Sequence, residues 1–160
     1  MPQNCILNVA DLLQKEIGTQ KTYQVSLSRL DIDQEVLLKT PAEGTVTVVK
    51  VEEGGLLVSF HLNLVVEVEC ARCLKRFNLP VRLNYTDEFS IQNPESTNQI
   101  TPQNTIDLLP SIIQEIILAL PLKPICQMTC QGIKIGAKNV YPKTKKISCP
   151  PRHAKGSPGT

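Results

Sequence analysis

The chain has 160 residues, of which 41% are hydrophobic and 4% aromatic, and it has no tryptophan. This length can bury one good core, so it predicts a single domain with a tail and argues against two full domains. A core of isoleucine, leucine and valine favours β-strands with one or two helices. The most apolar stretch, within residues 106–120, is shorter than the ~20 residues of a membrane-spanning helix, so we expect no membrane partner.

Charge is distributed unevenly along the chain, although the formal net charge is only +2. Residues 1–115 hold nine Lys or Arg and all fifteen acids, a balance of −6, whereas residues 116–160 hold eight basic residues and no acid, a balance of +8. A basic end of this kind suggests an anionic partner. It is equally compatible with a solvated tail that only keeps the protein soluble.

The N-terminal part is expected to contain a short helix and a first strand. Apolar residues from Ile6 to Ile17 recur at helical spacing, and Gly18 follows as a stop. Residues 23–30 alternate between apolar and polar side chains and indicate a strand. The first residues show neither a secretory signal nor a clear transit peptide. We therefore predict a cytoplasmic protein, or one of the plastid stroma if the source is a plant.

A long β-hairpin is predicted from Gly44 onward. Its turn contains Gly54 and Gly55, which can take the positive φ of a tight hairpin. The second strand has one apolar face, made by Val58, Phe60, Leu62, Leu64, Val66 and Val68. A third strand is expected over residues 77–89, where Pro80 requires an edge or a bulge. The CARC motif at residues 70–73 is expected to form the tip between these two strands.

The segment around residues 106–120 has the pattern of an amphipathic helix. Its apolar stripe, at i, i+3, i+4, i+7, i+8 and i+11, consists of Leu109, Ile112, Ile113, Ile116, Ile117 and Leu120. Asp107 can cap the first turn, and Pro121 stops the helix because its ring removes a donor and clashes with the preceding turn. We expect the stripe to be buried against a sheet. The polar face is expected to contain Ser111, Gln114 and Glu115.

Two segments lack any such pattern. Residues 90–105 are predicted to form a mobile loop because they contain two prolines and almost no apolar side chain. Residues 134–160 are predicted to be a disordered tail. The sequence therefore predicts an α+β domain over residues 1–133. It is expected to be an antiparallel sheet covered by one main helix, with a CxxC hairpin tip and a disordered basic C-terminal tail.

Four of the six cysteines form two pairs that could hold one metal ion. Cys70 and Cys73 have the spacing that lets two thiolates converge on a tetrahedral zinc ion. Cys126 and Cys130 are one residue further apart, and 52 residues separate Cys73 from Cys126. The sequence alone cannot bridge that gap. Two interpretations stay open: one zinc site built by all four thiolates, or two pairs of unliganded thiols.

Enzymatic activity has little support in the sequence. A redox CxxC pair opens a helix, whose N-terminus lowers the thiol pKa, whereas Cys70 and Cys73 are expected between strands. His61 and His153 have no evident nucleophile or orienting acid nearby in the sequence. Cys5 is expected, like Cys149, in a loose end of the chain as a spare thiol. We predict no enzyme and no small-molecule substrate, and a thiol-disulfide oxidoreductase is the alternative.

Basic side chains crowd the expected tip and continue into the tail. Those beside the CARC motif are Arg72, Lys75 and Arg76. If the second cysteine pair packs against the tip, the tail extends the same positive surface. Its basic residues are Lys134, Lys138, Lys143, Lys145, Lys146, Arg152 and Lys155. Such a surface suits phosphate contacts, which give affinity without reading base sequence.

Three segments make the chain resemble the YceD family. They are VECARCLKRF at residues 68–77, the strand end DEF at residues 87–89, and IDLLPSIIQEIILALPLKPIC at residues 106–126. The resemblance covers roughly residues 44–133. The segment from Cys126 to Ile133 is similar to the cyanobacterial and plastid branch, which has C-x-x-x-C-x-G-I there. Lys134 stands where some members have a further cysteine, so a zinc site would have to use the two pairs named above or remain incomplete.

The resemblance implies a role in the accumulation of large-subunit ribosomal RNA. We therefore expect a non-enzymatic factor for biogenesis of the large ribosomal subunit. Its expected partner is ribosomal RNA, the pre-ribosomal large subunit or an assembling ribosomal protein. A pure protein–protein adaptor also stays open, in which the helix and a sheet edge hold a partner and the basic tail plays no part.

Overall fold

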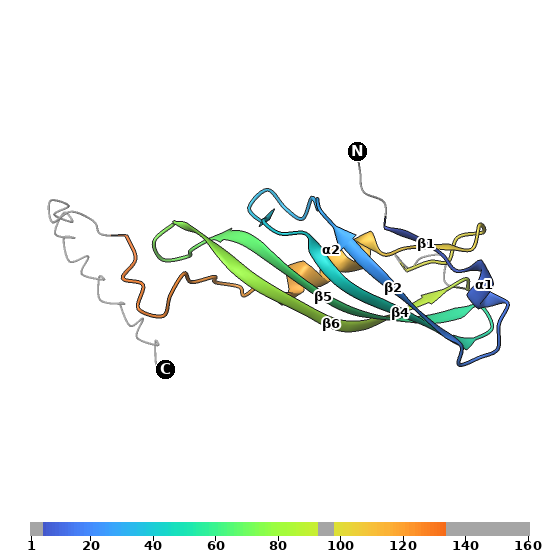
Figure 1. Cartoon of the computed structure of the whole chain (residues 1–160). Coiled ribbons are helices and arrows are strands. Elements are labelled where there is room, and N and C mark those ends of the chain that lie inside the picture. Colours follow the sequence, from blue (N-terminus) through green and yellow to red (C-terminus); the bar gives the residue numbers. More distant parts are fainter. Residues whose placement is uncertain (1–4, 93–97, 134–160) are drawn as a thin grey trace, which may run out of the picture.

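The computed structural model describes residues 5–92 and 98–133, which form two antiparallel β-sheets and two helices (Figure 1). The larger sheet contains β2 (Gln20–Leu27), β3 (Leu37–Leu38), β4 (Ala42–Glu52), β5 (Gly55–Glu69) and β6 (Arg76–Ser90). The smaller sheet pairs β1 (Ile6–Asn8) with β7 (Thr105–Asp107). The helices are α1 (Ala10–Leu13) and α2 (Leu109–Ala119). The chain is mainly antiparallel sheet with helices, which agrees with the predicted α+β class.

Strand β5 is the centre of the larger sheet. On one side β6 pairs with it from Gly55↔Ser90 to Glu69↔Arg76, and on the other side β4 and then β3 pair with it. Every second residue of β5 from Val58 to Val68 is buried. The predicted apolar face of this strand is therefore confirmed, and it forms one wall of the core.

The hairpin between β4 and β5 turns at the predicted glycines. Glu52 pairs with Gly55, and Gly54 takes the positive φ of 76°. Among the described strands only β5 pairs with β6, and an isolated bridge touches only the last residue of β6, so β6 is an edge strand. Pro80 lies opposite Val65, whose N–H and C=O groups bond to Thr40 and Lys39 on the other side of β5. The missing N–H of Pro80 therefore falls at the open edge, as predicted.

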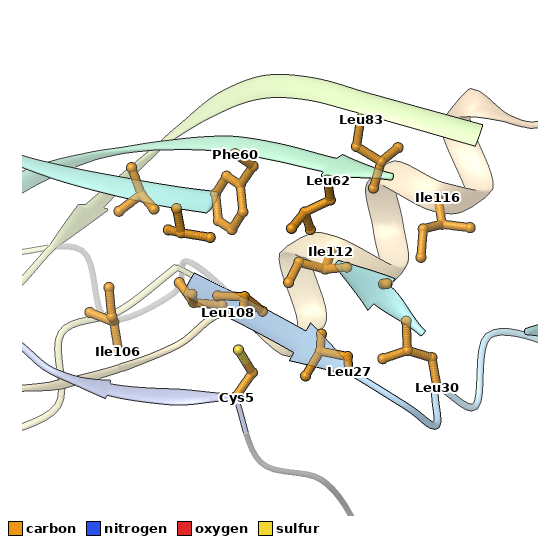
Figure 2. Close-up of a cluster of buried hydrophobic side chains, with 14 of the residues drawn as sticks. Cys5, Leu27, Leu30, Phe60, Leu62, Leu83, Ile106, Leu108, Ile112 and Ile116 are labelled. Atoms are coloured by element: carbon orange, nitrogen blue, oxygen red, sulfur yellow. The ribbon is translucent and has the colours of Figure 1, made fainter. Parts of the chain in front are cut away.

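Helix α2 begins and ends at the predicted signals. Asp107 Oδ1 accepts the backbone N–H of Leu109 at 3.0 Å, and Pro121 follows the last residues of the helix. Ile112 and Ile116 are fully buried and contribute to the core beside Leu27, Leu30 and Leu83 (Figure 2).

The buried face of α2 is rotated relative to the predicted stripe. Ile117 is 50% exposed, so its assignment to the buried face was wrong. Ser111, predicted to stay outside, is buried. Its hydroxyl lies 3.2 Å from the hydroxyl of Tyr85 and donates to a carboxylate oxygen of Asp87, both on β6. The polar groups on β6 thus bind the side of α2 that carries Ser111. The apolar pattern of the helix alone could not indicate this orientation.

The predicted N-terminal helix is divided into two elements. Residues 6–8 form β1 because their backbone pairs with residues 105–107 of β7, and α1 covers only Ala10 to Leu13. Cys5 is buried and contacts the core near Leu108 (Figure 2). Its assignment to a loose end was therefore wrong. The signal that sequence reasoning lacked is the pairing with a segment about one hundred residues away.

The segment that returns from β6 to α2 makes backbone contacts in its described part. Ser90 forms an isolated bridge with Gln99, and buried Ile100 forms another with Ile106. The predicted mobility of residues 90–105 stays a prediction, and the predicted disordered tail lies outside the described residues. In the part of the chain that the structure describes, no helix has the length and apolar character needed to cross a membrane.

Candidate metal centre

The first cysteine pair lies in the turn that joins β5 to β6. The backbone N–H of Cys70 donates to the carbonyl of Lys75 at 2.9 Å, and that of Leu74 donates to the carbonyl of Cys70 at 3.0 Å. Leu74 closes the turn in the left-handed conformation, with φ 59°. These bonds fix the backbone at both ends of the CARC motif and so fix the positions of Cys70 and Cys73.

The second cysteine pair reaches this turn along the segment that follows α2 (Figure 1). The backbone N–H of Ala71 donates to the carbonyl of Pro124 at 2.8 Å. The guanidinium of Arg72 donates to the carbonyl of Cys130 at 3.2 Å. Gly132 has φ +79°, and a Cβ atom there would lie 3.2 Å from the carbonyl oxygen of Arg72. Backbone contacts therefore close the gap that separates the two pairs in the sequence.

The four sulfur atoms gather in one cluster. The Sγ atoms of Cys70, Cys73, Cys126 and Cys130 all lie within 4.8 Å of one another. Cys70 Sγ lies 3.9 Å from Cys130 Sγ, and Cys73 Sγ lies 3.8 Å from Cys126 Sγ. A tetrahedral zinc ion with Zn–S bonds of ~2.3 Å requires S···S separations of about 3.8 Å. The cluster therefore has the donor type, donor number and spacing of a closed structural zinc site.

The surroundings of the sulfurs favour thiolates at one position and oppose them at another. Hydrogen bonds from the backbone N–H groups of Cys73, Cys126 and Arg72 lower the pKa of Cys70 to about 6. Burial, followed by the neighbouring sulfurs, raises the pKa of Cys126 to about 12. A divalent cation held by the four sulfurs would offset the effects of burial and of the neighbouring sulfurs, because it would stabilise each thiolate directly. The chemistry of the donor set therefore fits a metal ion better than four free thiols.

The cluster is closed on one side and reaches a surface cleft on the other. Cys70 and Cys130 are buried, and Cys73 and Cys126 are half-buried. Cys73, Cys126 and Cys130 line a cleft of about 780 Å³, whereas Cys70 does not. Lys75, Gln127 and Thr129 also line this cleft. No sequence pattern singled out Gln127 or Thr129, because their relevance depends on the fold that brings them beside the turn.

The predicted basic residues at the turn differ in their partners. Arg72 is held by the carbonyl groups of Met128 and Cys130, and Arg76 lies 3.5 Å from Glu67 in an ion pair. Lys75 is exposed at the cleft and forms no ion pair within the described part of the chain. Lys75 is therefore the most available of the three cations for an added ligand.

The predicted tail cations belong to the C-terminal segment that follows the cysteine cluster. Lys134, Lys138, Lys143, Lys145 and Lys146 lie outside the described residues, as do Arg152 and Lys155. Their segment begins one residue after Ile133, which lines the cleft beside the cysteine cluster. Lys123, exposed next to Pro124, is a cation near the turn that the sequence-based set did not include.

The chain matches a protein-family model. The model described as large ribosomal RNA subunit accumulation protein YceD matches residues 58–155. The matched range contains all four clustered cysteines, the turn and α2. It starts later than the resemblance read from the motifs and extends further into the basic segment.

Curated relatives are found in mycobacteria. The chain is 30% identical over 118 residues to the uncharacterized protein Rv2926c of Mycobacterium tuberculosis strain H37Rv, and equally to the uncharacterized protein Mb2951c of Mycobacterium bovis. Each match covers 69% of this chain and 54% of the relative. The chain thus spans about half the length of the curated relatives it matches. No solved structure matches the chain.

Proposed function

Because the chain belongs to the YceD family, the family of the large ribosomal RNA subunit accumulation protein, we propose that it is a non-enzymatic factor for biogenesis of the large ribosomal subunit. It acts by binding ribosomal RNA at the turn between β5 and β6. The four-cysteine cluster at this turn is the observation that carries the proposal. Cys70, Cys73, Cys126 and Cys130 would hold a zinc ion that joins the turn to the segment after α2, from which the basic C-terminal residues continue. The turn and these basic residues would then contribute to one RNA-binding surface.

The charge of this surface supports phosphate contacts. Lys75 is exposed, and the Arg72 guanidinium keeps further N–H donors beyond those bonded to Met128 and Cys130. Each phosphate that a cation neutralises releases counterions, so the affinity of such a surface falls steeply with salt. The role of the metal is structural, because four thiolate ligands leave no open position for a substrate.

RNA crosslinking in cells tests this function directly. Crosslinking of the full chain, followed by sequencing of the bound fragments, is expected to recover a few clustered positions of large-subunit ribosomal RNA. The double variant Lys75→Glu with Arg72→Glu is expected to lose most of this signal. The matched control Lys15→Glu with Lys21→Glu, exposed cations elsewhere, is expected to keep it. If the unaltered chain recovers ribosomal RNA only at the background level, a function as a protein–protein adaptor is favoured instead.

The oxidoreductase alternative predicts a different outcome at the same residues. The lowered pKa of Cys70 is the observation that favours it, because a thiolate is the reactive form of cysteine. However, a redox pair needs only Cys70 and Cys73, and it gives no role to Cys126 and Cys130. If the Cys70→Ser and Cys73→Ser variants lose a measurable disulfide reductase activity and still bind ribosomal precursors, the redox function is correct.

A further inference from the structure

A second surface lies where α2 ends, and its apolar side chains are not covered. Ile117 is half exposed, and Leu122, five residues further on, is fully exposed. Leu120, between them, is half-buried. Residues three apart in a helix are neighbours on its surface, so Ile117 and Leu120 form a continuous patch that leads to Leu122. We call this patch, together with Val36 opposite it, the α2 exit surface.

A small cavity opens in the α2 exit surface. Its volume is about 190 Å³, enough for an aliphatic side chain. Val36 and Glu35 line one side, and Leu120 and Leu122 line another. The cavity therefore offers an apolar pocket with a carboxylate at its rim.

The backbone beside the cavity is held in place. Pro121 and Pro124 restrict φ on both sides of Leu122, and the carbonyl of Pro124 accepts the N–H of Ala71 at 2.8 Å. A partner that binds a preorganised surface loses less conformational entropy on association. The exposed Leu122 is therefore presented on a rigid segment, which suits a binding contact.

Acidic residues lie on the connection that contributes Glu35 and Val36 to the α2 exit surface. Asp31, Asp33 and Glu35 are exposed on the connection between β2 and β3, and no basic residue occurs between Arg29 and Lys39. Lys39 is itself paired with Glu67 at 2.8 Å. None of these three acids forms an ion pair with another described residue. Lys123 is the cation next to Leu122 in the chain, so the three acids outnumber the cation in the two segments that form this surface.

From this combination we propose that the α2 exit surface binds a polypeptide segment rich in lysine and arginine that carries an aliphatic side chain. The aliphatic side chain enters the 190 Å³ cavity, and the cations lie against Asp31, Asp33 and Glu35. Such complementarity sets partner choice and accelerates association. Nucleic acid is disfavoured because the same carboxylates repel phosphate. This site is separate from the RNA-binding surface proposed above and does not depend on it.

Site-directed photocrosslinking tests the inference with the full chain. A photoreactive phenylalanine analogue replaces Leu122, the protein is irradiated in cells, and the crosslinked peptides are identified by mass spectrometry. The same analogue at Ile17, exposed beyond α1, is the positional control. One double variant carries Asp31→Lys and Glu35→Lys. Its control carries Glu16→Lys and Glu88→Lys, which reverse the charge of two exposed acids elsewhere.

The expected result is crosslinking from position 122 to Lys/Arg-rich polypeptide segments that contain a Leu, Ile or Val. Reversal of Asp31 and Glu35 is expected to reduce the yield by about tenfold, because two attractions become repulsions. The Glu16 and Glu88 reversals are expected to leave it unchanged. Crosslinks to RNA or to neutral or acidic segments overturn the inference. A yield no higher than at position 17, or equal loss in both double variants, also overturns it.

Discussion

Buried polar side chains determine where the flanking segments meet the sheet. Lys50 on β4 is buried, and its ammonium donates to the carbonyls of Leu13 at 2.8 Å and Lys15 at 2.9 Å. These carbonyls lie at the end of α1, where a helix leaves backbone acceptors unpaired. Lys50 therefore attaches α1 to the sheet. The Ser111 hydroxyl has a comparable role for α2, because it bonds to Tyr85 and Asp87 on β6.

Lys50→Met removes this attachment while keeping the length of the side chain. We expect a loss of about 1–3 kcal/mol in the free energy of unfolding, because two carbonyls lose a charged donor. Urea unfolding at neutral pH measures it. The matched control is Lys39→Met, whose side chain is 45% exposed and paired with Glu67. Its expected loss is below ~1 kcal/mol. Equal stability of Lys50→Met and the unaltered protein would show that desolvation of the ammonium offsets its bonds.

Cys5 makes stability depend on pH at the alkaline end. Burial, followed by the charge of Asp107, raises the pKa of Cys5 from 9.0 to about 11. Between these values the unfolded chain loses the thiol proton and the folded chain keeps it, so stability falls as pH rises from 9 to 11. Cys5→Ala removes this contribution. The urea midpoint of the unaltered protein is expected to approach that of the variant as the pH rises from 8 to 11. A difference between the two midpoints that stays constant over this range would contradict a raised pKa for Cys5.

At the scale of elements, α2 has two unlike faces. Ile112 and Ile116 are buried in the core, whereas Ile117 points away from it and contributes to the α2 exit surface. The apolar residues of α2 cover a wide arc of the helix, and Ser111, Gln114 and Glu115 occupy the remaining arc. A wide apolar stripe of this kind cannot indicate which side contacts the sheet. The side of α2 that faces the sheet is determined by Tyr85 and Asp87, which bond to Ser111.

Ile116→Ala and Ile117→Ala separate these two faces. Ile116→Ala is expected to cost about 2–5 kcal/mol of unfolding free energy, because it leaves a cavity in the core. Ile117→Ala is expected to change it by no more than about 0.5 kcal/mol, as for other surface sites. Half-buried Ile113→Ala should fall between them. Thermal or urea unfolding of the three variants measures the order, and equal losses at positions 116 and 117 would refute the observed rotation of α2.

Local signals in the sequence predicted the elements whose determinants are local. The alternation from Val58 to Val68, the turn at Gly54 and the end of α2 at Pro121 depend on neighbouring residues, and the structure has them. The pairing of β1 with β7 could not be predicted, because it joins segments about one hundred residues apart that show no strand pattern of their own. The same limit explains why Cys5 was assigned to a loose end.

At the scale of the whole molecule, the candidate metal site also has a part that the sequence predicts and a part that only the fold determines. The ligand type and spacing of Cys70 and Cys73 predicted a metal-binding pair, and the second pair was visible in the sequence. The sequence did not show that the two pairs lie together. Their proximity depends on the bond from Ala71 to Pro124 and on the bonds of Arg72 to the backbone near Cys130. Those contacts form only when α2 lies against β6 and directs the following segment toward the turn.

A zinc ion held by the four cysteines would join the turn between β5 and β6 to the segment after α2. Protein purified without chelator is expected to contain one zinc ion per chain, and removal of the ion by a chelator is expected to lower the melting temperature by about 5 °C or more. The physical reason is that the metal closes a long connection, between Cys73 and Cys126, whose ordering costs conformational entropy. Atomic absorption and thermal unfolding measure the two quantities.

Single cysteine variants distinguish a metal site from thiols that merely pack together. Cys130→Ser is expected to lose the zinc ion and to become insensitive to chelator, because a hydroxyl is a poor replacement for a thiolate ligand. Cys149→Ser, which leaves the cluster intact, should keep both the ion and the chelator response. If the unaltered protein is metal-free and equally stable with and without chelator, the cluster is not a zinc site. The turn and the segment after α2 would then be held together by the Ala71 and Arg72 bonds alone.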